Sequence, residues 1–339
     1  MTDITFFSSP IGLGHVTRDS AIMPHLQKIN TKFVTGNYAA KFLKQSGFDV
    51  ADVYNPPQFI VKNGTLQNSL KWLWRYYKYY KDCKKICTQI IKKEKPKVVV
   101  SDEDFASLTI AQNQNLPSIL ITDILETRFT SGFSSFIEKK MNQTMREIME
   151  KCDVVILPEE GIDQGNIRRV GPIVREINFS RDELRKKFSF NKKTIIISVG
   201  GTDVGKFLIE KTLETSIMSN DVEMVIVSGP SLEIDYGKNI RNLGFVNNLH
   251  EIVFAADLII ALAGKSTIDE SKAYGTPGIF IPIKNHFEQE DNAKEEGFSF
   301  EDVNRLDSLI WKKLDEKRNP QNYNGAKKAA EIINNIISK

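Results

Sequence analysis

Cysteine is scarce in this sequence, and long apolar runs are absent. Its three cysteines, Cys83, Cys87 and Cys152, are too few and too scattered for a disulfide framework or a zinc site. No stretch approaches the roughly 18 consecutive apolar residues of a membrane-spanning helix, and the N-terminal residues lack the basic and apolar segments of a secretory signal. We therefore expect a soluble protein in a reducing, cytoplasmic setting.

A large net charge is also missing. The 339 residues include 46 Lys and Arg against 43 Asp and Glu, a net charge of +3, which argues against a general nucleic-acid-binding protein. The segment 71–97 is the exception, because nine Lys and one Arg there outnumber two acidic residues. A hydrophobic fraction of 41% is ordinary for a globular protein, and the length predicts about two domains.

Short apolar runs rich in β-branched residues alternate with longer amphipathic segments. This pattern is typical of parallel strands joined by crossover helices, and it predicts an α/β fold. The expected strands cover residues 4–8, 31–34, 97–101, 118–122 and 154–157, and then 194–199, 223–228, 258–261 and 278–281. We expect an N-terminal domain over 1–163, a second domain over 164–320, and a C-terminal helix within 321–339 that docks on either domain.

Two glycine-rich turns follow expected strands of the second half, and both are incomplete as P-loops. Gly200–Lys206 has the spacing G-x-x-x-x-G-K but continues with Phe207, while Gly264–Thr267 reads G-K-S-T with Ile259 where the first glycine belongs. A strand that ends in small residues and opens a helix still presents backbone N–H groups to an anion. Each turn alone is as well explained by tight chain reversal, but together they favour a nucleotide diphosphate ligand.

Polar residues also follow two strands of the first half. Gly12, Gly14 and His15 come after the first strand, and a histidine there is either a general base or a capping and packing residue. Asp102 and Asp104 spell D-x-D after the strand 97–101. That spacing holds manganese in some sugar transferases, but a solvated strand end is the interpretation we favour.

The second half contains an ordered succession of motifs. They are the segments 244–249 (GFVNNL), 256–260 (ADLII), 263–270 (AGKSTIDE), 275–277 (GTP) and 286–293 (HFEQEDNA). This succession resembles the donor-binding half of the MurG-like glycosyltransferases of family 28, which have the GT-B fold of two facing Rossmann-like domains.

Three further segments extend the resemblance. Gly200–Thr202 is similar to the family's Gly-Gly-Ser/Thr loop, Gly12–His15 to its N-terminal glycine-rich loop, and Pro172–Arg175 to its interdomain Pro-Val-Arg. The likeness is strong from about residue 170 to 295 and patchier in the first half, where it depends mainly on residues 9–18.

The resemblance implies a binding site for a UDP-sugar. The backbone of Val246 would pair with uracil, Arg175 would lie near the base, and the Glu270 carboxylate would accept hydrogen bonds from the ribose. The residues that would bind the diphosphate are Thr202, Gly264, Lys265, Ser266 and Thr267. Lys265 replaces one of the small residues that are common in that loop. Its ammonium group could contact the leaving diphosphate or point into solvent, and the sequence favours neither alternative.

The resemblance also implies sugar and acceptor contacts. Gln289, with His286 and Asn292 nearby, would contact the donor sugar, although Glu288 replaces one of the family's paired glutamines and leaves the identity of the sugar open. His15 would act as the base from the acceptor domain, beside Gly12 and Gly14. Asp102, Asp123 and Glu126 are weaker alternatives or orienting partners for it.

The segment 71–80 is both basic and aromatic, with Trp72 and Trp74 among six aromatic residues in nine. As a helix it would carry an apolar stripe formed by Leu73, Tyr76, Tyr80, Cys83, Cys87 and Ile90. Trp, Tyr and Lys together suit a membrane surface or a lipid-linked acceptor. An ordinary amphipathic helix on the sheet is the alternative, and nucleic acid is the least favoured partner.

The expected function is therefore a metal-independent, inverting transfer of a hexose, GlcNAc or similar, from a UDP-sugar to a lipid-linked acceptor. No cofactor is expected beyond this co-substrate, and the enzyme would work at the inner face of the membrane as a peripheral protein. Two alternatives remain: a UDP-sugar hydrolase of the same fold, and a non-catalytic nucleotide-sugar-binding subunit.

Overall fold

The computed structural model describes residues 2–27, 29–130, 135–200, 203–215, 221–229 and 240–338. Contacts divide the chain into two compact units. Unit 1 consists of residues 1–58, 68–174 and 323–339, and unit 2 of residues 59–67 and 175–322. The boundary near residue 174 follows the strand 167–169, which pairs within unit 1, whereas the sequence placed the boundary at 163.

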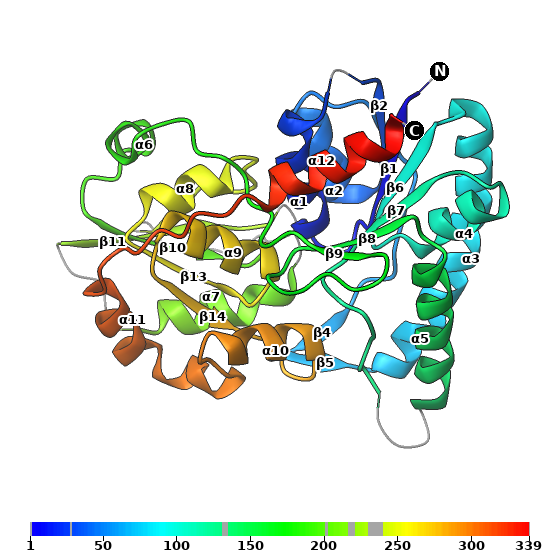
Figure 1. The fold of residues 1–339 in the computed structure, drawn as a ribbon. Coiled ribbons are helices and arrows are strands. Elements are labelled where there is room, and N and C mark those ends of the chain that lie inside the picture. The colour runs from blue at the N-terminus through cyan, green and yellow to red at the C-terminus, as the bar shows by residue number, and fades with distance from the viewer. Residues whose placement is uncertain are drawn as a thin grey trace. The chain divides into compact units, whose positions relative to one another are not determined.

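Within its described residues, unit 1 contains a seven-stranded parallel sheet (Figure 1). The strands in spatial order are β3 (Val50–Asp52), β2 (Thr31–Thr35), β1 (Ile4–Ser8), β6 (Val98–Asp102), β7 (Ser118–Ile121), β8 (Val154–Leu157) and β9 (Ile167–Arg169). Strands β1, β6, β7 and β8 are buried along their whole length, as their continuous apolar sequences predict. The strand order reverses at β1, which pairs with β2 on one side and β6 on the other.

Apart from the C-terminal helix, the helices of unit 1 lie between these strands in the chain. They are α1 (Gly14–Ile22), α2 (Asn37–Gln45), α3 (Ser69–Glu94), α4 (Phe105–Asn113), α5 (Ser135–Glu150) and α12 (Gly325–Ile337). The C-terminal helix α12 joins unit 1 and packs on α1. A side chain at Gly325 would collide with the backbone oxygens of Gly171 and Pro172, so glycine permits this close approach.

The described part of unit 2 contains a five-stranded parallel sheet. Its spatial order is β12 (Arg241–Asn242), β11 (Val222–Val227), β10 (Lys193–Ser198), β13 (Leu258–Leu262) and β14 (Gly278–Ile281). The helices are α6 (Arg181–Phe188), α7 (Lys206–Leu213), α8 (Leu249–Ala255), α9 (Lys265–Tyr274), α10 (Phe287–Glu295) and α11 (Leu306–Leu314), with a 3₁₀ helix η4 (Phe300–Arg305). The order reverses at β10, so both units are doubly wound and the predicted α/β class is confirmed.

A small antiparallel hairpin was not expected from the sequence. It joins β4 (Ile60–Lys62) to β5 (Thr65–Gln67) through Asn63 and Gly64, whose φ angles of 49° and 73° fit a tight two-residue turn. The chain on either side of the hairpin belongs to unit 1, but the hairpin itself belongs to unit 2. Its backbone pairs there with Lys284.

Candidate active site

The predicted histidine lies where the strand order of unit 1 reverses. His15 is in the first turn of α1, directly after β1, and Asp102 is the last residue of the neighbouring strand β6. Ligands of doubly wound sheets bind outside the carboxyl ends of the strands at this reversal point. The sheet topology therefore places both side chains where a substrate of unit 1 is expected.

Asp102 orients the imidazole. Its fully buried carboxylate lies 2.7 Å from Nδ1 of His15 and accepts two hydrogen bonds from Arg18, at 2.9 Å from Nε and 2.6 Å from Nη2. A buried carboxylate is stable only with such partners. Asp102 is thus an orienting partner of His15, and its interpretation as a solvated strand end is wrong.

Asp104, the other aspartate of the D-x-D, has a separate structural role. It is buried, caps α4 by accepting hydrogen bonds from the backbone N–H groups of Ala106 (2.9 Å) and Ser107 (3.3 Å), and accepts another from the hydroxyl of Tyr54. The two aspartates therefore act on different elements. In the described residues, no group of three or more His, Cys, Asp or Glu side chains is placed to hold a metal ion.

Glu103 is a member of this cluster that sequence reasoning missed. Its Oε2 lies 3.8 Å from Nε2 of His15, and its Oε1 accepts a 2.8 Å hydrogen bond from the Thr122 hydroxyl. Its φ of 57° is rare for a residue with a side chain, and such strain concentrates at functional sites. The signal available in the sequence was its place between Asp102 and Asp104, directly after a buried strand.

The two other predicted carboxylates differ in position. Asp123 accepts a 3.1 Å hydrogen bond from Nη1 of Arg18, so it joins the cluster. Glu126 is exposed and lies 3.7 Å from Arg146 instead. Arg18 therefore links the carboxyl ends of β6 and β7 to α1, which explains why a long cation is buried at this point.

The carboxylates of the cluster control the charge of His15. Burial by itself lowers the pKa of His15, but its interactions with the carboxyl groups of Glu103 and Asp102 outweigh this effect and raise the pKa to about 9. Burial opposes the ionisation of Asp102, yet Arg18 and His15 hold its pKa below the usual value. His15 therefore carries a proton at neutral pH and becomes a base as the pH rises.

The remaining acceptor-side residues lie on two elements of unit 1. Gly12 has a φ of 81° and open space beside its Cα, and Gly14 begins α1. Trp72 is buried in α3, where it stacks on Tyr76 and donates a 2.9 Å hydrogen bond to the Pro57 carbonyl. Trp74, by contrast, is 60% exposed on the same helix.

The reversal point of unit 2 is also open. Gly200, with a φ of 78°, follows β10, and Gly264 follows the neighbouring strand β13 and precedes α9. A methyl group added to either glycine would meet no atom of the described residues within 4 Å. The N-cap residue of α9 is Gly264, which has no side chain to cap the helix, so the first turn begins with backbone N–H groups at this end of the sheet. Thr202, predicted to bind the diphosphate here, lies outside the described residues.

Lys265 and its neighbours form the first turn of α9. The Lys265 ammonium forms an ion pair with the Asp269 carboxylate, one turn further along the helix. The sequence offered contact with the diphosphate or exposure to solvent for Lys265, and neither alternative included this ion pair. Ser266 and Thr267 follow Lys265 in the same turn, and the N–H of Thr267 bonds to the Gly264 carbonyl at 3.1 Å.

The structure joins two predicted nucleotide-binding residues directly. Arg175 donates to both oxygens of the buried Glu270 carboxylate, at 2.7 and 3.1 Å, and to the Asn247 carbonyl at 3.0 Å. Tyr274 in turn donates a 2.7 Å hydrogen bond to the Arg175 carbonyl. This network fixes Glu270 beside the loop that contains the half-buried Val246. Each carboxylate oxygen can accept a further hydrogen bond, so the pairing with Arg175 leaves Glu270 able to bind hydroxyls.

The three predicted sugar contacts lie around the loop between β14 and α10. His286 directly precedes α10 and is buried, and burial lowers its pKa to about 4, so the imidazole is neutral at pH 7. Gln289 accepts a 3.0 Å hydrogen bond from the Ile283 N–H. Asn292 donates a 3.1 Å hydrogen bond to the carbonyl of Ala263, the residue before Gly264. Through this last bond, Asn292 connects α10 to the glycine turn at Gly264.

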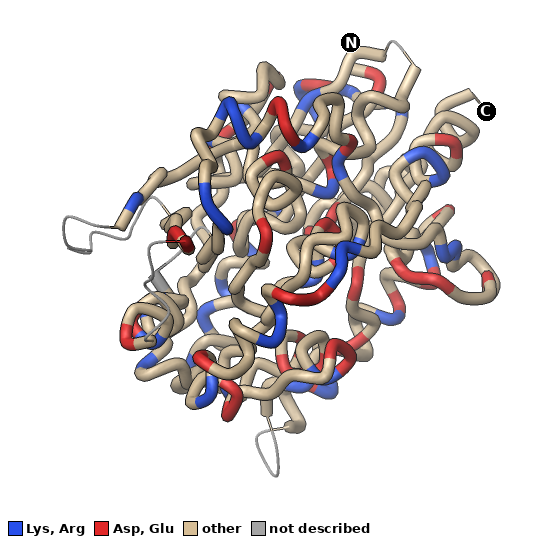
Figure 2. The backbone as a smooth tube through the Cα atoms, turned by 90° about the vertical axis from the view of Figure 1, so that its left-hand side faces the viewer, with Lys and Arg blue, Asp and Glu red and all other residues tan. Residues whose placement is uncertain are grey.

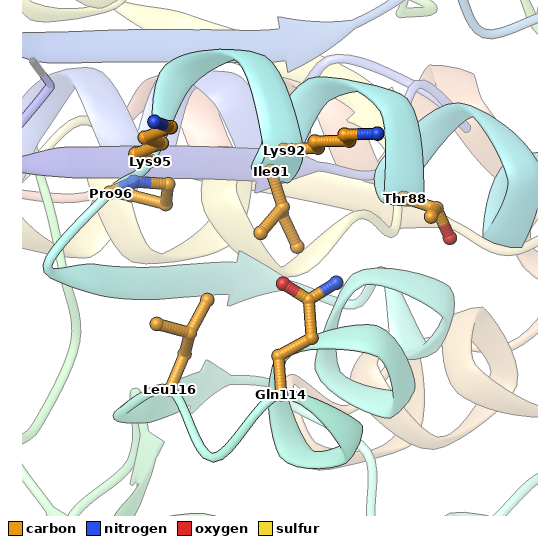
Figure 3. Close-up of a pocket in the computed structure, with 7 residues that line it drawn as sticks. All are labelled: Thr88, Ile91, Lys92, Lys95, Pro96, Gln114 and Leu116. Atoms are coloured by element: carbon orange, nitrogen blue, oxygen red, sulfur yellow. The ribbon is translucent and has the colours of Figure 1, made fainter.

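A surface pocket of about 410 Å³ lies apart from these residues (Figure 3). In unit 1, it is bordered by the end of α3, where Ile91 faces Leu116 across the space, and by the turns before β6 and β7. His15 and Asp102 lie at the opposite, carboxyl end of β6. This pocket is therefore not part of the histidine site.

Comparisons with known proteins bear on the fold and on the class of enzyme. Residues 196–334 match the glycosyltransferase family 28 C-terminal domain. A glycosyltransferase of Methanosarcina acetivorans described as uncharacterized is 26% identical over 326 residues, covering 87% of this chain and 84% of the relative. The UDP-N-acetylglucosamine–N-acetylmuramyl-(pentapeptide) pyrophosphoryl-undecaprenol N-acetylglucosamine transferase of Clostridium botulinum is 24% identical over 357 residues, covering 96% and 95%.

A solved structure supports the fold. The glycotransferase of kitacinnamycin superposes with a TM-score of 0.63 at 12% identity, covering 99% of this chain and 95% of its own. Two doubly wound units with this likeness define the GT-B fold, and the chain is a glycosyltransferase. More particularly, it carries the family 28 C-terminal domain and resembles the MurG-like enzymes, as its motifs indicated.

Proposed function

We propose that this glycosyltransferase moves a hexose, GlcNAc or similar, from a UDP-sugar to a lipid-linked acceptor, with inversion at the anomeric carbon and without a metal. The observation that carries the proposal is the His15–Asp102 pair at the strand reversal of unit 1, in a chain whose other unit contains most of the residues that match the family 28 C-terminal domain. The Clostridium botulinum relative, whose name specifies UDP-N-acetylglucosamine and a pyrophosphoryl-undecaprenol substrate, supports the choice of donor and acceptor.

In the proposed reaction, His15 acts first on the acceptor. Neutral Nε2 of His15 takes the proton of the acceptor hydroxyl while the oxygen attacks the anomeric carbon, and Asp102 stabilises the imidazolium that forms. Such a base contributes about 10²- to 10⁴-fold in rate. The bond between the anomeric carbon and the phosphate oxygen breaks, so the electron pair leaves with UDP.

Unit 2 would hold the donor in this reaction. Backbone N–H groups of the uncapped first turn of α9 would bind the diphosphate and stabilise its growing charge as it leaves. Glu270, fixed by Arg175, would accept hydrogen bonds from the ribose, and the Val246 backbone would bind uracil. Gln289, His286 and Asn292 would bind the donor sugar.

One face of α3 supports a membrane-bound acceptor. Leu70, Trp74 and Tyr77 are 39%, 60% and 45% exposed and follow helical spacing, so they share a face. Basic residues flank them, and the Lys81 ammonium lies 4.4 Å from the centre of the Tyr77 ring. Exposed rings with lysines suit an anionic membrane surface, where each lysine contributes about 1 kcal/mol. We infer a peripheral enzyme on the cytoplasmic face.

The proposed membrane-binding surface is confined to α3, since basic and acidic residues are interspersed over the backbone seen in Figure 2. Among the residues that the structure describes, no helix is both long enough and apolar enough to cross a membrane.

UDP release from UDP-GlcNAc, measured with and without a lipid extract of the source cells, tests the proposed function. Release that depends on the extract, together with a labelled lipid product, is the expected result. Equal release in both reactions would identify a UDP-sugar hydrolase instead. Binding of UDP without release from any UDP-hexose offered with the extract would favour a non-catalytic binding subunit.

A further inference from the structure

The β4–β5 hairpin is attached to the loop that precedes α10. The Lys284 N–H donates to the Gly64 carbonyl at 2.8 Å, and the Leu66 N–H donates to the Lys284 carbonyl at 2.9 Å. These two bonds make a parallel bridge between Thr65 and Lys284, and the hairpin lies beside α10 (Figure 1). A segment from the N-terminal half of the chain thus completes the edge of unit 2 next to His286.

An aromatic contact continues this attachment to His286 itself. The ring of Phe59, one residue before β4, lies edge-on to the His286 imidazole, with 5.3 Å between ring centres and 65° between planes. Edge-to-face pairs are directional, so the phenyl ring restricts the rotation of the imidazole. The neutral imidazole can then present its ring nitrogens in one orientation.

The tip of the hairpin is held tightly as well. A Cβ at Gly64 would lie 2.6 Å from the Phe300 ring and 2.9 Å from the Phe207 ring, so only glycine fits between η4 and α7. Lys284 adds a 3.0 Å ion pair with Glu301. Because the tip, the strand β5 and Phe59 are all fixed on unit 2, the hairpin is a rigid support for the loop from 283 to 287.

We propose that the β4–β5 hairpin is part of the donor-sugar subsite and that Phe59 is a positioning residue for His286. The inference rests on the proposed function, in which His286, Gln289 and Asn292 bind the sugar of the donor. Gln289 holds the same loop from α10 through the Ile283 N–H. The loop is therefore held on one side by α10 and on the other by the hairpin.

Phe59→Ala tests this role when UDP and UDP-GlcNAc are titrated separately by calorimetry. Loss of the ring contact lowers the affinity for UDP-GlcNAc about 2- to 10-fold and leaves the affinity for UDP unchanged, because UDP lacks the sugar. Phe59→Tyr keeps the ring and restores the wild-type ratio. The matched control is Phe188→Ala, which removes a half-buried ring of unit 2 that contacts Phe190 at 5.6 Å.

The outcomes separate the two proposals. Suppose that the wild type binds both ligands. If Phe59→Ala then weakens the binding of UDP and of UDP-GlcNAc equally, or leaves both affinities unchanged, the hairpin has no role in sugar binding and the proposed function stands. If the wild type binds neither UDP nor UDP-GlcNAc, the proposed donor is wrong and the sugar subsite falls with it. Thermal unfolding of each variant confirms that the affinity changes do not come from loss of the fold.

Discussion

At the scale of single residues, the candidate base was predictable and most of its surroundings were not. Gly12, Gly14 and His15 form a local motif after a strand, so the sequence alone located them. Asp102 was named as one of several partners, but its pairing with His15 requires that β6 lie next to β1. Arg18 could not be assigned because the carboxylates that it binds are 84 and 105 positions away in the chain, and the placement of Glu103 depends on an unusual φ.

The first prediction concerns the pH dependence of this pair. Because the pKa of His15 is raised to about 9, kcat/KM of the wild type should rise with pH through an inflection near pH 9 and level off only above it, where His15 is mostly neutral. Asp102→Asn removes one of the charges that raise this pKa. We expect the inflection to move to lower pH and kcat to fall by about 10²-fold or more, since the imidazolium loses its stabilising partner.

The control for this prediction is Asp49→Asn. Asp49 is an exposed carboxylate paired with Lys32, so its variant should keep the wild-type profile. A pH profile of Asp102→Asn with an unmoved inflection would show that His15 is not the titrating base.

At the scale of elements, the first turn of α9 makes a second prediction. The φ of Gly264 suits any residue, and an added methyl group meets no atom within 4 Å in the part of the chain that the structure describes. Gly264→Ala should therefore keep the Tm of the wild type and lower the affinity for UDP by about 10-fold, since the methyl group occupies the space proposed for the diphosphate.

Gly275→Ala is the contrasting variant for thermal unfolding. Gly275 ends α9 with a φ of 67°, and its Cβ would lie 2.5 Å from the Pro320 nitrogen, so this change should lower Tm. Unchanged UDP binding by Gly264→Ala would place the diphosphate elsewhere.

The helix α3 makes a third prediction, about the membrane. Its stripe was predicted from spacing, and Leu73, Cys83 and Cys87 are indeed buried. The sequence did not distinguish Trp72 from Trp74, since both belong to the same aromatic run. Trp72 is buried by partners that include residues outside the run, namely the Pro57 carbonyl and the Phe129 ring. Trp74→Ala should lower binding to vesicles rich in anionic phospholipid by about 10-fold, because a large exposed ring is lost.

Trp311→Ala provides the matched control for the vesicle assay. Trp311 is 49% exposed on α11 of unit 2, so its loss should leave vesicle binding unchanged. Equal losses in both variants would indicate unspecific adsorption through exposed tryptophan rather than a surface on α3.

At the scale of the whole molecule, the alternation of strands and helices was sufficient to predict two α/β units. Local patterns did not reveal that two segments belong to the unit from which they are distant in the sequence. Residues 59–67 belong to unit 2, and residues 323–339 belong to unit 1. Both assignments depend on contacts between distant segments, such as Leu66 with Lys284 and α12 with α1. The Asn63-Gly64 dipeptide was the available signal for the hairpin.

The fourth prediction concerns the reaction as a whole and its need for a metal. In the proposed mechanism, the N-terminal turn of α9 stabilises the negative charge on the departing UDP, and His15 accepts the proton of the acceptor hydroxyl. Both charge changes are therefore stabilised by groups of the protein. Chelation with EDTA, followed by desalting, should therefore leave lipid-dependent UDP release within twofold of the untreated enzyme. Loss of activity that Mn²⁺ or Mg²⁺ restores would contradict this, because the diphosphate would then need a cation that unit 2 does not replace.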